Sequence, residues 1–500
     1  MAARGGTAII MPMLIKRLLF SLCLALLPAG LLAEGLPDLG EAAQAGLSPQ
    51  MEKRIGASIM HDILLHEPSY VDDAEVTGYV NRLGLRLVSQ SSDVHQDFQF
   101  FVLKDATLNA FAMPGGYIGV HTGLILAAQS ESELASVLAH EISHVTQHHL
   151  ARQLGGQSQA QLPMLLSLAV AILAARSSPD AAAGALMAGQ AAAIQQQLNY
   201  SRDFEREADR LGLRLLERAG FDTRAMAAFF ERMQKFGRIY DNNAPGYLRT
   251  HPLTSERIAD MENRIEGSPY RQVPDALDFL LLRAKLRSAL GTPSEAVKDF
   301  SAQLAEHKFS SEAAARYGLA RAQLRAGKPA AAERELAQLR RAGVDSAMLE
   351  SLAAELRLAQ GDAVAAVKLL NQALLRYPQE RGLVYALIEA LLSQGDAREA
   401  LRVSQDDLQR YPGDSHMHTL QARSYAALGK RLQQHSAQAE AYALLGLLSP
   451  AIEQLELAQK AGDGDFYELS QVDSRLRQLK QRKLQELKDA KDTKQPKAEK

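Results

Sequence analysis

The sequence predicts an α+β, mostly helical protein: an N-terminal domain with a small sheet, followed by an all-α solenoid of repeated helical hairpins. Three observations support this fold class. The chain has 500 residues, which is too long for one ordinary hydrophobic core, so two or more domains are expected. Alanine and leucine are abundant and tryptophan is absent, which favours helices. From about residue 275 onward, glycines recur at nearly constant spacing.

The overall charge balance does not point to a nucleic-acid partner, although local basic patches remain the alternative. The 56 Lys and Arg residues face 58 Asp and Glu residues, which leaves a formal net charge of −2. Proteins that bind nucleic acid are usually basic overall or carry a basic domain. We therefore expect no nucleic-acid partner.

The first 33 residues resemble an export signal. Lys16 and Arg17 precede the apolar run LLFSLCLALLPAGLLA, which ends near Ala33. The run is short and contains a proline, so it suits a cleaved signal better than a membrane span, although an uncleaved anchor is the alternative. The only cysteine, Cys23, lies inside this run, so the exported chain would carry no thiol. We expect a periplasmic protein and leave open a peripheral attachment to the outer membrane.

Residues 34–270 are predicted to form the first domain. Helical patterns cover Met51–Leu65 and Asp73–Leu87. Two segments read as strands: DFQFFVL, Asp97–Leu103, which alternates and is rich in aromatic residues, and GGYIGVHTGLI, Gly115–Ile125, which begins with a glycine pair.

The stretch SVLAHEISHVTQHHLAR is predicted to form one helix, which begins at a capping box of Ser130 and Glu133. His140 and His144 are four residues apart, so both imidazoles project from one side of the helix and can bind one metal ion. Neutral imidazole nitrogens suit Zn²⁺. Glu141 lies beside the first histidine, where its carboxylate can take a proton from a water molecule at the metal.

A third ligand is predicted in NYSRDFEREADRLGLRLL, residues 199–216. On a helical projection, the apolar face is formed by Phe204, Ala208, Leu211 and Leu215. Glu205 lies beside this face, whereas Glu207 lies with the arginines on the polar face, so Glu205 is the better ligand. Asp209, one turn further, can accept a hydrogen bond from the far nitrogen of a metal-bound histidine. The alternative is that Glu205 and Asp209 pair with arginines on a solvated face.

The remaining histidines of this region are assigned separately. His148 is expected on the same helical side as the two ligands, either behind them or partly exposed. His149 is expected to face elsewhere, at the surface. His251, in THPLTSER, is hypothesised to approach the metal. It would hold the fourth position in a resting state or contact the reacting carbonyl. A histidine of an ordinary turn is the alternative.

Two further segments of the first domain have candidate roles. The predicted strand Gly115–Ile125 could pair with an extended substrate through backbone hydrogen bonds, or be an ordinary sheet strand. The apolar Leu162–Ala175 and the Ala/Gly-rich Asp180–Ala193 could form a buried helical hairpin or a mobile flap beside the active site.

The second part of the chain, residues 275–475, is predicted to consist of tetratricopeptide repeats. Its glycines are spaced by 36, 34, 34 and 34 residues: Gly291, Gly327, Gly361, Gly395 and Gly429. Thirty-four residues is the length of one such repeat, a pair of helices. Stacked repeats form a curved solenoid whose concave face suits a polypeptide ligand. Residues 480–500 are dense in charge and are predicted to be a fraying helix and then a disordered tail.

Four stretches together carry a family resemblance. HEISH is followed about sixty residues later by SRDFEREAD, and NAFAMPGGYIGVHTGLI and THPLTSERI accompany them. In these stretches, residues 50–265 resemble the M48 family of zinc metallopeptidases. The resemblance implies a zincin-like metallopeptidase domain with one Zn²⁺ per chain. It assigns the metal ligands to His140, His144 and Glu205 and the general base to Glu141.

The resemblance also implies a function for the whole chain. Some members of the family are embedded in membranes, whereas this chain lacks long apolar spans and resembles the exported branch. That branch implies a periplasmic zinc-dependent endopeptidase in outer-membrane protein quality control. It would degrade misfolded or stalled barrel proteins and assist assembly, in partnership with the barrel-assembly machinery through the repeats. The alternative is a repeat-based chaperone or adaptor with a normally latent protease site.

Overall fold

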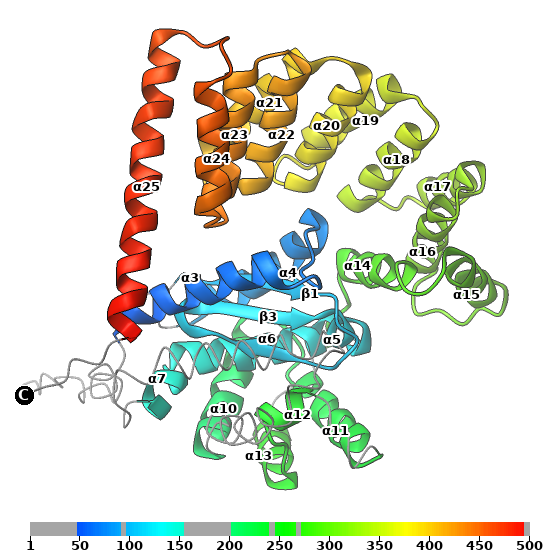
Figure 1. Cartoon of the computed structure of the whole chain (residues 1–500). Helices are drawn as coiled ribbons and strands as arrows, with labels where there is room; N and C mark the ends of the chain where they lie inside the picture. The colour runs from blue at the N-terminus through cyan, green and yellow to red at the C-terminus, as the bar shows by residue number, and fades with distance from the viewer. Residues whose placement is uncertain (1–47, 92–96, 155–201, 240–245, 267–271, 495–500) are drawn as a thin grey trace, which may run out of the picture.

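A computed structural model describes residues 48–91, 97–154, 202–239, 246–266 and 272–494 (Figure 1). The predicted signal peptide, residues 1–33, lies outside the described residues. So do the apolar segment Leu162–Ala175 and the Ala/Gly-rich segment Asp180–Ala193. Within the described part of the chain, no helix combines the length and the apolar character needed to cross a membrane.

The two predicted N-terminal helices are confirmed as α3, Pro49–His66, and α4, Ala74–Val88. Each begins at a side-chain cap: Ser48 accepts a hydrogen bond from a backbone N–H of α3, and Asp73 accepts two from α4. Such caps satisfy backbone donors that a helix leaves free in its first turn.

A three-stranded sheet lies between α3, which covers one face, and α4, which covers the other. Its strands are β1, Gln99–Leu103, β2, Ala110–Ala112, and β3, Tyr117–His121, in the order β1-β3-β2. β3 pairs in parallel with β1 and antiparallel with β2. Both predicted strands are present, whereas β2 was not predicted because three residues are too few to show alternation.

The second predicted strand is shorter than expected at both ends. Before it, Pro114–Gly116 form the short 3₁₀ turn η1, in which both glycines have positive φ angles of 77° and 86°. After it, the chain turns directly into helix α5, Thr122–Ala127.

Helix α6, Glu131–Thr146, carries the H-E-x-x-H motif. The Ser130 hydroxyl caps it by accepting the N–H of Glu133 at 3.2 Å. The reciprocal half of the predicted capping box is absent: the Glu133 carboxylate accepts instead from the N–H of Gln129 and pairs with Arg232. The expected single helix is also wrong, because α6 ends at Thr146 and a separate helix α7, His149–Leu154, follows.

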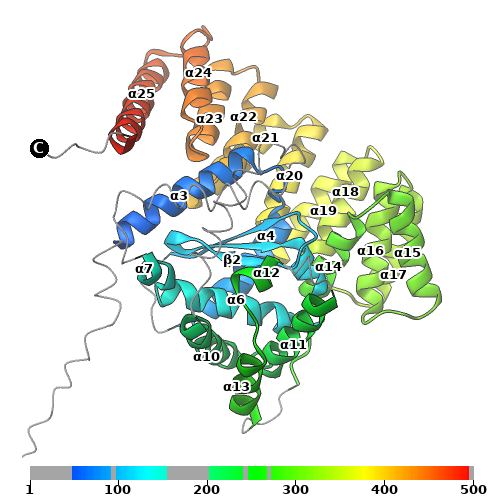
Figure 2. The same ribbon diagram turned by 60° about the horizontal axis from the view of Figure 1, so that its bottom comes forward.

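The remaining helices of the first domain lie below α6 in Figure 1, and Figure 2 shows α10, α11 and α13 on that side of it. They are α10, Arg202–Arg218, α11, Arg224–Ile239, α12, Gly246–Thr250, and α13, Ser255–Glu266. Since α10 and α11 both contact α6, the motif helix is enclosed by the sheet on one side and by helices on the other.

The repeat region forms a solenoid of paired helices. Its helices are α14, Leu277–Ser288, α15, Pro293–Ala305, α16, Glu312–Arg325, α17, Pro329–Arg341, α18, Ala347–Ala359, α19, Ala363–Arg376, α20, Arg381–Gln394, α21, Ala397–Arg410, α22, Ser415–Ala427, α23, Arg431–Leu444, α24, Leu448–Gln459, and α25, Phe466–Lys494. The five glycines of the predicted repeat stand between paired helices, with φ between 55° and 89°. Glycine suits these left-handed turns because it lacks a Cβ.

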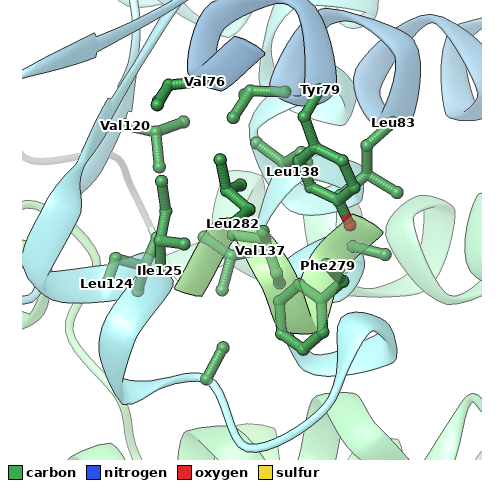
Figure 3. Packing of buried hydrophobic residues seen from close by; sticks show 14 of the residues in the cluster. Val76, Tyr79, Leu83, Val120, Leu124, Ile125, Val137, Leu138, Phe279 and Leu282 are labelled. Carbon is green, nitrogen blue, oxygen red and sulfur yellow. The ribbon is translucent and has the colours of Figure 1, made fainter. Parts of the chain in front are cut away.

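One hydrophobic core joins the solenoid to the first domain. Figure 3 shows Phe279 and Leu282 of α14 packed against Tyr79 and Leu83 of α4 and against Leu138 of α6. All five belong to one cluster of buried side chains that continues into the first repeats. The first repeats are therefore packed onto the first domain across the predicted boundary near residue 270.

The far end of the solenoid curves back over α3 and α4 (Figure 1). Contacts of this far end with the first domain include Arg82 to Glu380 at 3.0 Å, Asp72 to His416 at 3.7 Å, and His61 to the carbonyl of Leu445. The last helix, α25, continues to Lys494, so residues 480–494 are helical, and the remainder of the predicted tail lies outside the described residues.

Candidate metal centre

Four side chains converge at one point between α6 and α10. His140 and His144 come from α6, Glu205 from α10, and His251 from the residue after α12. One potential ligand atom from each lies within 4.8 Å of the others. All four residues are at most 2% exposed.

The distances between these atoms fit a tetrahedral metal site. The Nε2 atoms of His140 and His144 are 3.0 Å apart, and each lies 3.5 Å from an oxygen of Glu205. Nδ1 of His251 lies 3.4 Å from Nε2 of His140. Ligand atoms that surround zinc at about 2.1 Å in a tetrahedron lie about 3.4 Å from one another. The donor set of imidazole nitrogens and one carboxylate therefore fits the metal that the motif predicts.

A close helix contact brings the third candidate ligand to the two histidines. Gly212 of α10 faces the backbone of α6, where an added Cβ would lie only 3.2 Å from the backbone nitrogen of His140. The small residue lets the two helices approach closely. Glu205, two turns before Gly212, consequently reaches the His140 side chain.

The helical projection correctly placed Glu205 on the inward side of α10 and Glu207 on the polar side. Glu205 is 1% exposed and points into the cluster, whereas Glu207 lies outside it. Phe204 and Leu211, which were expected on the apolar face, are only half-buried. The buried face is instead centred nearer to Glu205 and Asp209.

Asp209 lies beside the first histidine, as predicted. One carboxylate oxygen is 3.1 Å from Nδ1 of His140. Burial lowers the pKa of His140, but contacts with Asp209 and Glu205 outweigh burial and raise it to about 9. Burial raises the pKa of Asp209, but hydrogen bonds from Arg257 and His140 bring it below its ordinary value. The two carboxylates thus favour positive charge at this position.

Arg257, on α13, was not predicted as part of the site. Its guanidinium donates two hydrogen bonds of 2.7 Å to Asp209 and lies 2.8 Å from Glu205. The two carboxylates therefore do pair with an arginine, but all three groups are buried, not on a solvated face. The stretch THPLTSERI contains this arginine, yet nothing in one sequence distinguishes it from a surface residue.

Glu141 is fully buried beside the cluster. Among the described residues, neither of its carboxylate oxygens has a hydrogen-bond partner, and Nε2 of His251 is 3.5 Å from one of them. A buried carboxylate without a partner is costly. A water molecule at the cluster would satisfy it.

His251 lies in the cluster, and its surroundings are well defined. Its backbone N–H donates to the carbonyl of Tyr247, and its ring stacks on the Tyr247 ring at 4.7 Å and 28°. Its Nδ1 lies 2.9 Å from Glu205. Tyr247, another residue missed from sequence, is fully buried, and burial raises the pKa of its hydroxyl well above the ordinary value.

The prediction for His149 is wrong. This residue is fully buried, and its Nδ1 lies 2.9 Å from Nδ1 of His144. The expected position assumed one continuous helix, but the chain breaks at His148, whose φ is +50°. The break turns His149 toward the ligand histidine and leaves His148 partly exposed, 3.6 Å from Glu52.

The prediction of a substrate-pairing strand also needs correction. β3 is the central strand and already pairs with β1 and β2, so its backbone is not open to a substrate. At the two ends of the β2–β3 pair, the N–H of His121 donates to the carbonyl of Asn109, and the N–H of Met113 donates to the carbonyl of Tyr117. This register directs the backbone groups of Ala110 and Ala112 away from β3, and β2 contacts α6. The edge beside the motif helix is therefore that of β2.

Comparisons with known proteins agree with this architecture. The model of "Peptidase family M48" matches residues 74–265, and a tetratricopeptide-repeat model matches residues 357–424. The "Beta-barrel assembly-enhancing protease" of Escherichia coli (strain K12) is 33% identical over 450 residues, 89% of this chain and 91% of that protein. The "Mitochondrial metalloendopeptidase OMA1" of Schizosaccharomyces pombe is 30% identical over 45% of this chain and 64% of its own length.

Two other likenesses are more limited. A relative from Vibrio cholerae serotype O1 is 41% identical over 269 residues, and the match spans about half of each protein, 54% of this chain and 55% of the relative. The solved structure of the P58(IPK) TPR domain covers 70% of this chain and 89% of its own, with 14% identity and a TM-score of 0.15, too low to carry an argument.

Proposed function

This chain belongs to peptidase family M48, and on that premise we propose that it is a periplasmic zinc-dependent endopeptidase of outer-membrane protein quality control. The observation that carries the proposal is the convergence of His140, His144 and Glu205 on one point, with the Glu141 carboxylate beside them. A relative named for enhancing β-barrel assembly, matched over 91% of its length, supports the substrate class.

The proposed metal is one Zn²⁺ per chain, held by His140, His144 and Glu205. When bound, zinc supplies the Lewis acidity that makes a water molecule a better nucleophile and polarises a peptide carbonyl. Asp209, whose carboxylate oxygen lies 3.1 Å from Nδ1 of His140, would accept the Nδ1–H of this histidine and so direct its Nε2 lone pair into the cluster. Arg257 holds Asp209 and Glu205 in place by pairing with both.

Glu141 is the proposed general base. Its unpartnered carboxylate takes the proton of the attacking water and later passes this proton to the leaving amine. This role needs a carboxylate within reach of the cluster but not itself a ligand, which is how Glu141 lies.

An extended substrate would pair with the β2 edge at Ala110 and Ala112. Backbone pairing is largely independent of side chains, which suits an enzyme that cleaves misfolded proteins of many sequences. The solenoid, which packs on the same domain, would recruit these substrates and the barrel-assembly machinery.

A second candidate function is a chaperone or adaptor whose protease site is normally latent. The burial of the cluster favours it: the candidate ligands are at most 2% exposed, and His251 lies where a fourth ligand would stand. In this proposal, His251 holds the fourth position at rest and yields it to substrate.

The test is Glu141→Gln, which keeps the shape of the side chain but removes the base. We expect the variant to retain one zinc per chain by elemental analysis. Its rate of cleavage of an unfolded barrel protein should fall by about 10²- to 10⁴-fold. Glu217→Gln, an exposed change on α10, is the matched control and should leave the rate unchanged. Wild-type cleavage by Glu141→Gln would refute the mechanism, and full rescue of a deletion strain by an inactive variant would favour the chaperone.

A further inference from the structure

A chain of hydrogen-bonding groups leads away from His144 on the side opposite the cluster. Its Nδ1 lies 2.9 Å from Nδ1 of His149, and Nε2 of His149 lies 3.1 Å from a carboxylate oxygen of Glu207. Arg152 donates to the same oxygen at 2.9 Å. His149 is fully buried, whereas Glu207 and Arg152 lie at the edge of the site.

The backbone is shaped to make this contact. In a continuous helix, a residue five positions after His144 would point about 140° away from it. The break between α6 and α7 instead places His148 in the left-handed region, which is strained for a residue that has a Cβ. The ring of His149 is also fixed by Phe204, which stacks on it at 4.5 Å and 12°. A strained turn and a stacked ring thus hold one imidazole against another.

The positions of the hydrogens follow from the contacts. A neutral imidazole has one donor and one acceptor nitrogen. Because Nε2 of His144 faces the cluster with its lone pair, Nδ1 carries the hydrogen and donates to His149. His149 accepts at Nδ1, so its own hydrogen lies on Nε2 and points to Glu207, which can only accept. Every link of the chain then has one donor and one acceptor.

We propose that His149 is a positioning residue for the metal centre, which fixes the tautomer and ring orientation of His144 and passes the hydrogen bond on to Glu207. The inference rests on the proposed function, because it takes His144 as a ligand. Both ligand histidines then have a supporting carboxylate: Asp209 contacts His140 directly, and Glu207 supports His144 through one imidazole.

The experiment measures zinc affinity of the full-length chain, by competition with a chelator, independently of proteolysis. We expect His149→Ala to bind zinc about 10- to 100-fold more weakly than wild type, the usual loss when the support of a ligand histidine is removed. His149→Gln should restore most of the affinity, because its amide can accept from His144 and donate to Glu207. In cobalt-substituted protein, the visible absorption bands should shift in His149→Ala and return in His149→Gln.

Two further variants make the test specific. His148→Asn is the matched control, since asparagine tolerates the left-handed backbone, and it should bind zinc like wild type. His149→Ala combined with Glu207→Ala should bind no more weakly than His149→Ala alone, because the chain is already broken. Circular dichroism of the metal-free variants checks that they fold.

The outcomes separate this inference from the proposed function. Wild-type affinity in His149→Ala, or equal losses in His149→Ala and His149→Gln, would overturn the positioning role while the protease proposal stands. Failure of the wild-type chain to bind zinc at all would overturn both.

Discussion

The metal centre and the solenoid place their ion pairs and their glycines in different surroundings. In the centre, Asp209 and Arg257 are at most 3% exposed and hydrogen-bond to each other. In the solenoid, the pair of Arg423 and Glu389 joins residues 34 positions apart with side chains 51% and 39% exposed. Buried ion pairs are costly to break, whereas exposed pairs contribute little. The difference teaches that one substitution should cost more stability at this buried pair than at this exposed pair of the solenoid.

Removing Arg257 should have the largest effect on stability. Arg257→Met leaves Asp209 and Glu205 buried without their cation, which costs roughly 3–5 kcal/mol. Urea unfolding of the chelator-treated protein measures the change in the free energy of unfolding of the first domain. Arg210→Met, which removes a partly exposed pair with Asp260 from α10, is the control and should cost less than about 1 kcal/mol. Equal losses in both variants would contradict the idea that the buried ion pair contributes more to stability than the exposed one.

The second largest effect on stability is expected at a glycine where two helices of the metal centre touch. At Gly212, an added Cβ would press on the backbone of Ala139 and His140 at 3.2–3.3 Å, so Gly212→Ala should move α10 away from α6. Overpacking of this kind costs about 1–3 kcal/mol. Because Glu205 moves with α10, zinc affinity should fall together with stability. Unchanged affinity would mean that the two helices can separate without disturbing the cluster.

Substitution of a glycine in a turn of the solenoid should destabilise the protein less. At Gly361, φ is +79° and an added Cβ would meet no atom within 4 Å, so Gly361→Ala meets only backbone strain. The expected cost is about 1 kcal/mol, with no change in zinc affinity. Thermal unfolding and chelator competition on the same sample check both parts. A fall in zinc affinity would show that the turns of the solenoid act on the metal centre.

The smallest effect on stability is expected at the pair of Asp72 and His416, which links the first domain to the solenoid. Contact with Asp72 raises the pKa of His416 above 6.5, and contact with His416 lowers that of Asp72 below 3.8. A raised histidine pKa stabilises the fold below the ordinary histidine value, and this contribution is lost as pH rises through the folded pKa. The carboxylate contribution is present above 3.8 and is lost as pH falls.

The pair should therefore act between about pH 4 and pH 6.5 and fade above it. His416→Asn should lower the free energy of unfolding at pH 5.5 and have no effect at pH 9. Since both side chains are well exposed, 40% and 75%, the difference should stay below about 1 kcal/mol. A variant that is destabilised equally at both pH values would show that the contact is not ionic.

Local pattern in the sequence was enough for the features that depend on one helix or one repeat. The spacing of His140 and His144 places both on one side of α6, and the helical projection distinguished Glu205 from Glu207. The glycine spacing predicted the solenoid, because each repeat needs the same left-handed turn. These signals are local: they arise from helix geometry and backbone conformation, which neighbouring residues decide.

Only the tertiary structure decided which distant groups complete the site. Arg257 joins Asp209 across 48 residues, and the three-residue strand β2 takes the open edge that a longer segment was expected to provide. His149 was misplaced because a left-handed residue, which no pattern revealed, breaks the helix before it. Burial changes the meaning of such residues: a charge or an imidazole that would be solvated on an isolated helix must find a partner once the helices pack around it.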